Sequence, residues 1–334
     1  MADLASVLAN VAGDNDEAIG VRNWLSTGFP PLDEALSGKY FGGGMPSGRI
    51  IEMFGPESSG KTAIATQTMI HAQKEGGVAI FMDHERSFDH AIAEQQGLRV
   101  GKGEPFVFKT PDTFEESTTN VIKICQGIRD AKVIPVEAPI AVVFDSLASM
   151  VPKSKFAKDI DEQGMNDSLA LSKACSAVMP TLAVFAEKLN ICMLFLNQER
   201  EKPGVMFGDP ITTPGGRAPK FYASVRIQIG RTMIKKQVNG KKRPIGQEVK
   251  CKVIKNKVHR PFEEAAWKFM FREDGTGYFD VTGSLIDHLE ELDILKKSGN
   301  YYVWDDGKKY LRDALVKKID ESGEQQKLLD MLPK

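Results

Sequence analysis

The sequence predicts an α/β fold with a mostly parallel central sheet flanked by helices. Three apolar runs, at residues 78–82, 140–144 and 191–196, each lead into an acidic or amide side chain. Continuous runs of this kind are typical of parallel strands that are buried on both faces. A further strand is predicted at 49–54, because it leads into a glycine-rich turn and then a helix at 63–73. Strands that alternate with helices indicate a parallel sheet.

The composition sets the size and class of the protein. The chain has 334 residues, 42% of them hydrophobic, and a formal net charge of −1. Because one domain usually has roughly 100–200 residues, we expect one large domain with an appendage, or two domains. The four cysteines lie far apart, and no apolar run reaches the roughly 18 residues of a membrane span. We therefore expect a cytoplasmic protein with reduced thiols and no membrane partner.

The glycine-rich turn satisfies the pattern G-x-x-x-x-G-K-[ST] in full. Glycine at both ends lets successive backbone N–H groups converge on phosphate oxygens at the start of a helix. We expect Lys61 to reach the β- and γ-phosphates and the Thr62 hydroxyl to complete a Mg²⁺ shell. The candidate phosphate-binding residues are Gly55, Pro56, Glu57, Ser58, Ser59, Gly60, Lys61 and Thr62.

Three polar side chains follow the predicted strands at the carboxyl edge of the sheet, where open α/β sheets bind ligands. Glu85 is placed to orient a water for attack on the γ-phosphate, although its position alone also fits a surface acid. Asp145 ends a strand and is predicted to hold Mg²⁺. Gln198 is predicted to touch the γ-phosphate and to register its loss.

Two loops and a helix are predicted between and beyond these strands. A polar loop is expected at 154–166, before a helix at about 167–189 that Pro180 should kink or end early. A second loop, at 199–216, is rich in glycine and proline. Loops of this length are more often functional or disordered than packed. If Gln198 contacts phosphate, hydrolysis would order or release the second loop.

A basic β-hairpin is predicted after these loops. Residues 231–260 include eleven Lys or Arg and a single acid. The turn is expected at 238–241, and Lys250 and Lys252 share one face of the return strand. The stripe is either a surface that neutralises phosphates, with binding that weakens steeply in salt, or a solvated charged hairpin.

Together these segments resemble the RecA recombinase family in order and spacing. The matching segments are residues 55–62, 83–85, 143–146, 197–198, 204–208, 220–226 and 253–257. The resemblance implies an ATP-dependent recombinase with a RecA-like core, which polymerises on single-stranded DNA and catalyses homologous pairing and strand exchange in DNA repair. It implies ATP and Mg²⁺ as cofactors. The implied partners are single-stranded DNA, homologous double-stranded DNA, further copies in a helical filament, and loader and single-strand binding proteins.

Matched residue by residue, the resemblance assigns roles around the nucleotide. Asp89 matches a nucleobase contact, and Lys255 and Lys257 match a pair that reaches ATP across a protomer interface. Thr62 and Asp145 match the metal-binding groups. The implied catalytic residues are Lys61, Glu85, Gln198, Lys255 and Lys257.

The resemblance also implies a DNA-binding set in two loops, one before Asp167 and one at 199–213, and beyond them. The implied DNA-binding residues are Lys173, Arg200, Lys202, Val205, Met206, Phe207, Thr212, Thr213, Gly215, Gly216, Lys250 and Lys252.

This sequence departs from the family pattern at several positions. Ile92 stands where the family stacks a tyrosine on adenine, so stacking would fall to Phe271 or another ring. Pro203 stands where the family often inserts an aliphatic side chain between bases, which leaves Val205 or Met206 as the wedge. We interpret the chain as a diverged member, encoded by a cell or a phage.

Three segments and three functions remain as hypotheses. We expect an N-terminal arm at 1–25, a core at 26–279 and a small α/β domain at 280–334, with helices at 285–295 and 310–332. The recombinase competes with a ring or helicase-like motor ATPase, and with a non-catalytic single-strand binding protein that holds ATP as a structural ligand. Stimulation of ATP turnover by DNA would distinguish them.

Overall fold

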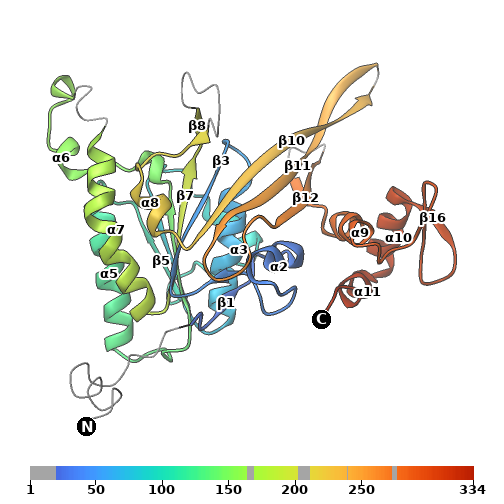
Figure 1. Ribbon diagram of the computed structural model, residues 1–334, viewed down its shortest axis with the longest axis horizontal. Coiled ribbons are helices and arrows are strands. Elements are labelled where there is room, and N and C mark those ends of the chain that lie inside the picture. Colours follow the sequence, from blue (N-terminus) through green and yellow to red (C-terminus); the bar gives the residue numbers. More distant parts are fainter. Residues whose placement is uncertain (1–19, 164–168, 202–210, 239, 273–276) are drawn as a thin grey trace, which may run out of the picture.

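A nine-stranded sheet lies at the centre of the protein (Figure 1). The computed structural model describes residues 20–163, 169–201, 211–238, 240–272 and 277–334. The strand order is β13-β12-β11-β10-β3-β7-β6-β4-β5. The six strands from β10 to β5 are parallel, and β11, β12 and β13 extend the sheet in antiparallel fashion. The predicted fold class is confirmed.

The parallel strands are built from the apolar runs. Their bounds are β3 (Arg49–Gly55), β4 (Val78–Asp83), β5 (Phe106–Lys109), β6 (Ile140–Asp145), β7 (Ile191–Gln198) and β10 (Val225–Val238). Every residue of β4 and β6 is buried, as expected for strands that are covered on both faces. The predicted strand ends agree with the observed ones to within two residues, because the buried run itself defines the strand.

Helices cover both faces of the parallel part. Along β3, Ile51 and Met53 pack into the cluster that contains α3 (Lys61–Lys74), whereas Ile50 packs into the cluster of α5 (Phe114–Asp130) and α7 (Ala170–Lys188). Alternate residues of one strand therefore fill two separate cores. Phe144 and Phe195 stack across neighbouring strands on the α5 and α7 side, with ring centroids 4.3 Å apart.

The antiparallel part contains the predicted hairpin. Its strands are β10 and β11 (Lys241–Asn256), and Val238 pairs with Lys241 at the expected turn. β12 (Glu264–Phe271) and β13 (Gly277–Phe279) follow, and the distal half of the hairpin projects beyond the sheet (Figure 1).

The segments predicted as loops contain short elements. α6 (Lys153–Phe156) lies in the first, and β8 (Arg200–Glu201) pairs with β9 (Ile211–Thr212) at the ends of the second. The helix that follows the first loop runs through Pro180 to Lys188, so an early end at Pro180, one of two expected outcomes, is wrong. Met179 and Leu182 are fully buried against the sheet, and this packing holds the helix together on both sides of the proline.

The remaining N-terminal elements are short. β1 (Trp24–Leu25) pairs with β2 (Met45–Pro46), and α2 (Pro30–Ser37) packs near β11 and β12. Residues 1–19 of the N-terminal arm expected at 1–25 lie outside the described residues.

The C-terminal segment combines three helices with a small sheet. Its elements are α9 (Val281–Glu291), β14 (Lys297–Ser298), β15 (Tyr301–Val303), β16 (Lys309–Leu311), α10 (Arg312–Ser322) and α11 (Gln325–Asp330). Tyr302 and Trp304 are buried there. Two predictions are wrong: Tyr310 lies in a strand, and the helix stops before Leu295 because Asp293 takes the left-handed conformation, with φ of 56°. None of the described helices is long and apolar enough to span a bilayer.

Candidate nucleotide-binding site

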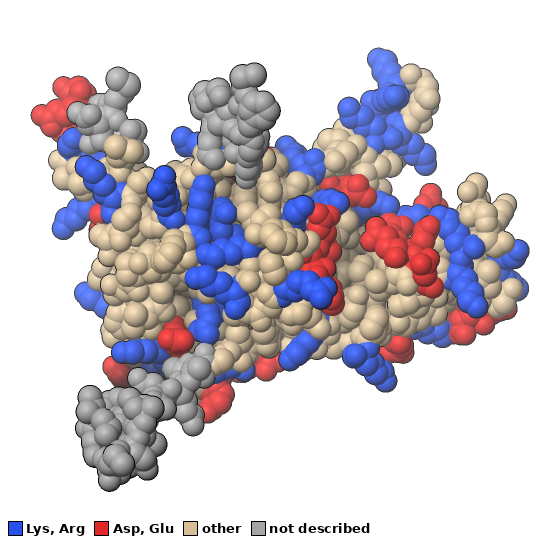
Figure 2. Space-filling view, viewed as in Figure 1, with Lys and Arg blue, Asp and Glu red and all other residues tan. Residues whose placement is uncertain are grey.

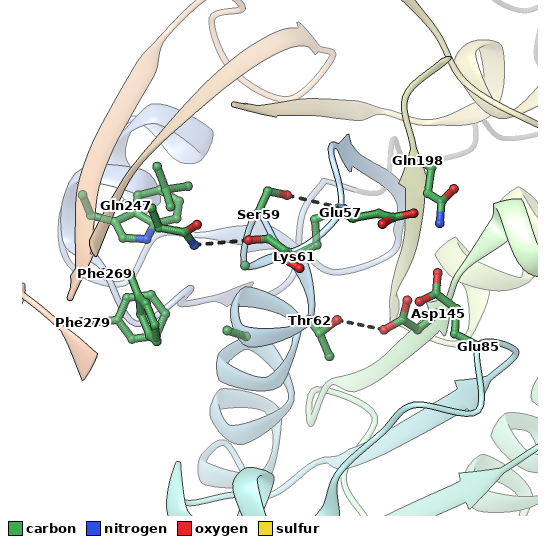
Figure 3. A pocket seen from close by; sticks show the side chains of 15 residues that line it. Glu57, Ser59, Lys61, Thr62, Glu85, Asp145, Gln198, Gln247, Phe269 and Phe279 are labelled. Carbon is green, nitrogen blue, oxygen red and sulfur yellow. Dashed lines mark hydrogen bonds between the residues drawn. The ribbon is translucent and has the colours of Figure 1, made fainter. Parts of the chain in front are cut away.

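The predicted site residues meet in a cavity of about 520 Å³ at the carboxyl edge of the sheet. The phosphate loop, residues 55–62, connects β3 to α3 at its centre. Figure 3 shows Glu85, Asp145 and Gln198 on one side of the loop and Gln247 with two phenylalanine rings on the other. The cavity therefore has an acidic side and an aromatic side.

The backbone of the phosphate loop depends on two glycines. Gly60 precedes α3 with a φ of 88°, a left-handed conformation that costs glycine little. A Cβ atom on Gly55 would lie 2.2 Å from the carbonyl oxygen of Ile229 on β10, so only glycine lets these two strands approach. The Lys61 ammonium donates to the carbonyls of Gly55 (3.1 Å) and Pro56 (2.7 Å). Burial lowers the pKa of Lys61, while the charges of Asp145 and other nearby acids oppose this shift.

A hydroxyl and a carboxylate meet at the position expected for the metal. Thr62 Oγ1 donates to Asp145 Oδ2 at 2.9 Å. Burial, followed by the charge of Glu85, raises the pKa of Asp145 to about 7. The described residues include no group of three or more His, Cys, Asp or Glu suited to a metal. These oxygen donors fit Mg²⁺, which usually takes one or two protein ligands and completes its shell with phosphate and water.

The side chain of Glu85 is held beside this pair. Ser146 Oγ donates to Glu85 Oε1 at 2.6 Å. The backbone N–H of Glu85 donates to the carbonyl of Asp145 at 3.1 Å, which ties the turn after β4 to the end of β6. Asp83 fixes the same turn, since its carboxylate accepts the N–H groups of Arg86 (2.7 Å) and Phe88 (3.1 Å).

A buried polar network lies behind Gln198, and the sequence analysis missed it. Asn197 is fully buried and donates to Glu52 Oε1 at 2.9 Å and to the carbonyl of Pro214 at 3.2 Å. Glu52 Oε2 also accepts from Arg226 at 2.6 Å. The feature of the sequence that could have indicated this network is Glu52, the single acid in the run 49–54. The network fixes the end of the second loop to the strand that carries Gln198.

The aromatic side of the cavity was also missed. It is lined by Gln247 and Val249 of β11, Trp267 and Phe269 of β12, and Phe279 of β13. Phe269 and Phe279 make an edge-to-face contact with centroids 5.2 Å apart. Gln247 donates to the carbonyl of Ser58 in the phosphate loop at 3.2 Å. Phe271, the ring named from the sequence, is 40% exposed and does not line the cavity.

Five predicted nucleotide residues do not line the cavity: Gly55 and Pro56 at the start of the phosphate loop, and Asp89, Lys255 and Lys257 from other elements. Asp89 is exposed and caps α4 (His90–Gln95) by accepting the N–H of Ile92 at 3.0 Å. Lys255 donates to the carbonyls of Lys220 (2.7 Å) and Phe221 (2.9 Å) in α8 (Ala218–Tyr222). Burial, followed by the charge of the nearby Lys257, lowers the pKa of Lys255 to about 8. Within one chain, the structure does not bring these lysines to the phosphate loop.

The predicted DNA-binding residues lie in different parts of the structure. Lys202, Val205, Met206 and Phe207 lie outside the described residues, as does Pro203. Lys173 of α7 and Arg200 of β8 are exposed, whereas Thr212 is half-buried and Thr213 is buried. Gly215 and Gly216 lie against α7, next to Cys175 and Ser172. Lys250 and Lys252 share Glu264 of β12, at 2.6 and 3.2 Å.

The fold and the site define an α/β protein of the P-loop class, with a cavity suited to a nucleoside triphosphate. A family model described as the RecA N-terminal domain matches residues 9–276. The chain is also 41% identical over 286 residues to Protein RecA of Streptococcus pneumoniae strains Hungary19A-6 and CGSP14, which covers 85% of this chain and 68% of each relative. This protein therefore belongs to the RecA family and is a RecA-like recombinase.

Proposed function

We propose that the protein is an ATP-dependent recombinase that polymerises on single-stranded DNA and catalyses homologous pairing and strand exchange. The observation that carries this proposal is the convergence of Lys61, Thr62, Asp145 and Glu85 in one cavity, in a chain of the RecA family. The proposed reaction is hydrolysis of ATP to ADP and phosphate, stimulated by DNA. We place this activity in the cytoplasm, in recombinational repair.

The phosphate loop would bind the triphosphate through its backbone N–H groups and through Lys61. Thr62 and Asp145 would hold Mg²⁺, which supplies charge neutralisation on the phosphate oxygens when bound. The rings of Phe269 and Phe279 offer an apolar wall for the base.

Glu85 would act as the general base. Its carboxylate would take the proton of a water that attacks the γ-phosphate, and the hydrogen bond from Ser146 orients it for this step. Because Ser146 donates to only one carboxylate oxygen in this contact, the other can face the water.

Gln198 would report the state of the γ-phosphate to the second loop. It adjoins Asn197, which is bonded to the carbonyl of Pro214 at the far end of that loop. A change at Gln198 would therefore reach both ends of the segment 199–216. This supports the assignment of the segment to single-stranded DNA.

We propose that ATP lies between protomers, with Lys255 and Lys257 of one protomer reaching the site of the next. Both lysines lie outside their own chain's cavity, as a contact in trans requires. Hydrolysis would then require assembly. The proposed parts are an arm at 1–25, a core at 26–279 and a C-terminal domain at 280–334, which has its own three-stranded sheet.

The decisive experiment measures ATP turnover of the purified protein with and without single-stranded DNA. Strong stimulation is expected. Turnover that ignores DNA would favour a ring or helicase-like motor, and a lack of turnover at saturating ATP would favour a single-strand binding protein with structural ATP. Electron microscopy with a non-hydrolysable ATP analogue should show helical filaments on the DNA.

A further inference from the structure

The turn that carries Glu85 is held from two sides. On one side, the backbone N–H groups of His84 and Glu85 donate to the carbonyl of Asp145, at 2.6 and 3.1 Å. On the other side, His84 Nε2 and Ser117 Oγ of α5 form a hydrogen bond of 2.9 Å. The ring of His84 therefore links the residue next to Glu85 to a helix that does not line the nucleotide cavity.

The bond between His84 and Ser117 is buried at its α5 end. Ser117 is fully buried and lies in the first turn of the helix, residues 114–117. A buried hydroxyl group that loses its partner costs free energy, so this pairing gives the His84 ring a definite place. Neither side chain lines the cavity, so the bond acts on the site only through the backbone that it holds.

A second contact joins the same turn to the start of the same helix. Arg86 follows Glu85 and takes the left-handed conformation, with φ of 58°. A residue other than glycine keeps this conformation only where its surroundings hold it. Here the Asp83 carboxylate accepts the Arg86 N–H at 2.7 Å, and the Arg86 guanidinium donates to Asp112 at 3.0 Å, two residues before α5 begins. Both neighbours of Glu85 are thus bonded to the start of α5.

The first turn of α5 is also bonded to the base of the first predicted DNA loop. The N–H of Phe114 donates to the carbonyl of Val151 at 2.9 Å. The Glu115 carboxylate accepts, at 2.8 Å, the N–H of Lys153, the first residue of α6. A carboxylate at this position satisfies one of the free N–H groups at the start of a helix. Figure 2 shows Lys and Arg side chains on the surface around α6, a charge that suits a phosphate backbone.

We propose that His84 and Ser117 are positioning residues for ATP hydrolysis, and that the first turn of α5 carries movement at the base of the first loop to Glu85. This inference rests on the proposed function, in which Glu85 is the general base and DNA stimulates turnover. It adds a connection that is separate from Gln198 and the second loop. Glu115 and Ser117 belong to one helical turn, so a shift of Lys153 that moves Glu115 also moves the partner of His84.

The position of Glu85 matters because a general base must lie within hydrogen-bond reach of the water that it deprotonates. A misplacement of about 1 Å in a catalytic site can cost about 10²-fold in rate. A bond that holds the neighbouring residue therefore affects turnover without touching the nucleotide.

The first experiment is a double-mutant cycle in the full-length protein. ATP turnover at saturating single-stranded DNA is measured over a range of ATP for His84→Ala, Ser117→Ala and the double variant. Each single variant should lower kcat about 3- to 10-fold, the size of one hydrogen bond, and leave the KM for ATP unchanged. The double variant should lose no more than the larger single loss, because both changes remove the same bond. His84→Gln keeps a nitrogen near the place of Nε2 and should recover most of kcat.

The matched control is Thr118→Val, which removes a buried hydroxyl group from the same helix. Thr118 Oγ1 donates within the helix, to the carbonyl of Phe114 at 3.0 Å, so this variant should keep the wild-type kcat. Binding of a fluorescent ATP analogue verifies that each variant is folded. Wild-type kcat in His84→Ala or Ser117→Ala would overturn the positioning role. Single losses that add in the double variant, or an equal loss in Thr118→Val, would overturn it as well, because the changes would then act through the stability of α5.

The second experiment tests the connection to the first loop and uses the half-buried Glu115, so it remains decisive if Ser117→Ala does not fold. Glu115→Ala removes the acceptor of the Lys153 N–H and should lower the ratio of turnover with DNA to turnover without DNA at least about 3-fold. A wild-type ratio would overturn the connection through α5. If DNA does not stimulate the wild-type protein, the proposed function fails, whereas the double-mutant cycle on DNA-independent turnover still decides the role of His84 and Ser117. A wild-type protein that hydrolyses no ATP would overturn both.

Discussion

Replacing Glu52 by alanine should be among the most destabilising single changes in the core. The Glu52 side chain is 1% exposed, and its partner Arg226 is 13% exposed. Glu52 accepts from Arg226 at 2.6 Å and from Asn197 at 2.9 Å. Alanine would leave a buried guanidinium without its carboxylate and a buried amide without one acceptor. This perturbation therefore removes the centre of the network, not one of its ends.

The expected loss in the free energy of unfolding follows from the burial of the Glu52–Arg226 ion pair. Removing one partner of a buried ion pair costs about 3–5 kcal/mol, because the other charge stays desolvated. Glu52→Gln has a similar shape and keeps an acceptor for Asn197, so it should cost less, about 1.5–3 kcal/mol for the lost charge-assisted bond. An exposed pair sets the lower reference: Lys317 and Glu321 are 75% and 69% exposed, and Glu321→Ala should cost below about 1 kcal/mol.

Urea unfolding followed by circular dichroism measures all three variants at the same pH and ionic strength. The expected order of destabilisation is Glu52→Ala, then Glu52→Gln, then Glu321→Ala. The reasoning is refuted if Glu52→Ala unfolds at the same urea concentration as Glu321→Ala, since the buried charge of Arg226 would then be compensated by something other than Glu52.

Two further predictions concern ATP hydrolysis at the site, and a third concerns the pH dependence of stability. Glu85→Gln preserves the acceptor for Ser146, so it should bind ATP and DNA normally while turnover falls by about 10²–10⁴-fold; hydrolysis at the normal rate would remove Glu85 from its role. Lys255→Ala should bind nucleotide as a monomer but lose DNA-stimulated hydrolysis, and normal stimulation would argue against a contact in trans. Burial lowers the pKa of His84 from 6.5 to about 4, so the folded protein takes up this proton less readily than the unfolded chain. The stability contributed by neutral His84 is present above pH 6.5 and is lost as pH falls toward 4. Over that window wild type should lose up to about 3 kcal/mol more than His84→Gln in urea unfolding.

The sequence was sufficient for the features that are local in the chain. The apolar run 78–82, together with the acid Asp83 that follows it, matches β4 residue for residue, because six consecutive buried positions leave little choice of structure. Asp145 and Gln198 reach one edge because parallel strands share a direction, and the phosphate loop follows from its own pattern. The tight turn at Asp293 shows the limit of periodicity: Leu295 is apolar, correctly spaced and buried, yet it lies beyond the helix.

Non-local pairing explains what the sequence did not reveal. The aromatic wall depends on β12 and β13 joining the sheet beside β11, and no local pattern specifies that order. For the same reason, counting charges along 231–260 missed Glu264, which lies outside the run but directly opposite Lys252 on the next strand. The count treated residues 231–260 as one basic stripe. Ion pairs with Glu264 compensate Lys250 and Lys252, whereas Lys236 and Arg243, nearer the turn, have no ion pair among the described residues.

The strand order also explains how nucleotide and DNA can influence each other. β3, which leads into the phosphate loop, pairs directly with β10, the first strand of the basic hairpin. At Gly55 the two strands lie so close together that a side chain would collide with the carbonyl oxygen of Ile229. The second strand of the hairpin touches the same loop through the bond from Gln247 to Ser58. A movement of the loop on binding or losing a phosphate would therefore act on both strands of the hairpin, and the hydrogen-bonded ladder between them would carry it along the hairpin. Gln247→Ala keeps every charge of the β10–β11 hairpin and breaks one of these two contacts. It should therefore leave the salt dependence of DNA binding unchanged and reduce the stimulation of ATP turnover by DNA. If stimulation in Gln247→Ala equals that of wild type, the loop and the hairpin are coupled through the backbone at Gly55 alone.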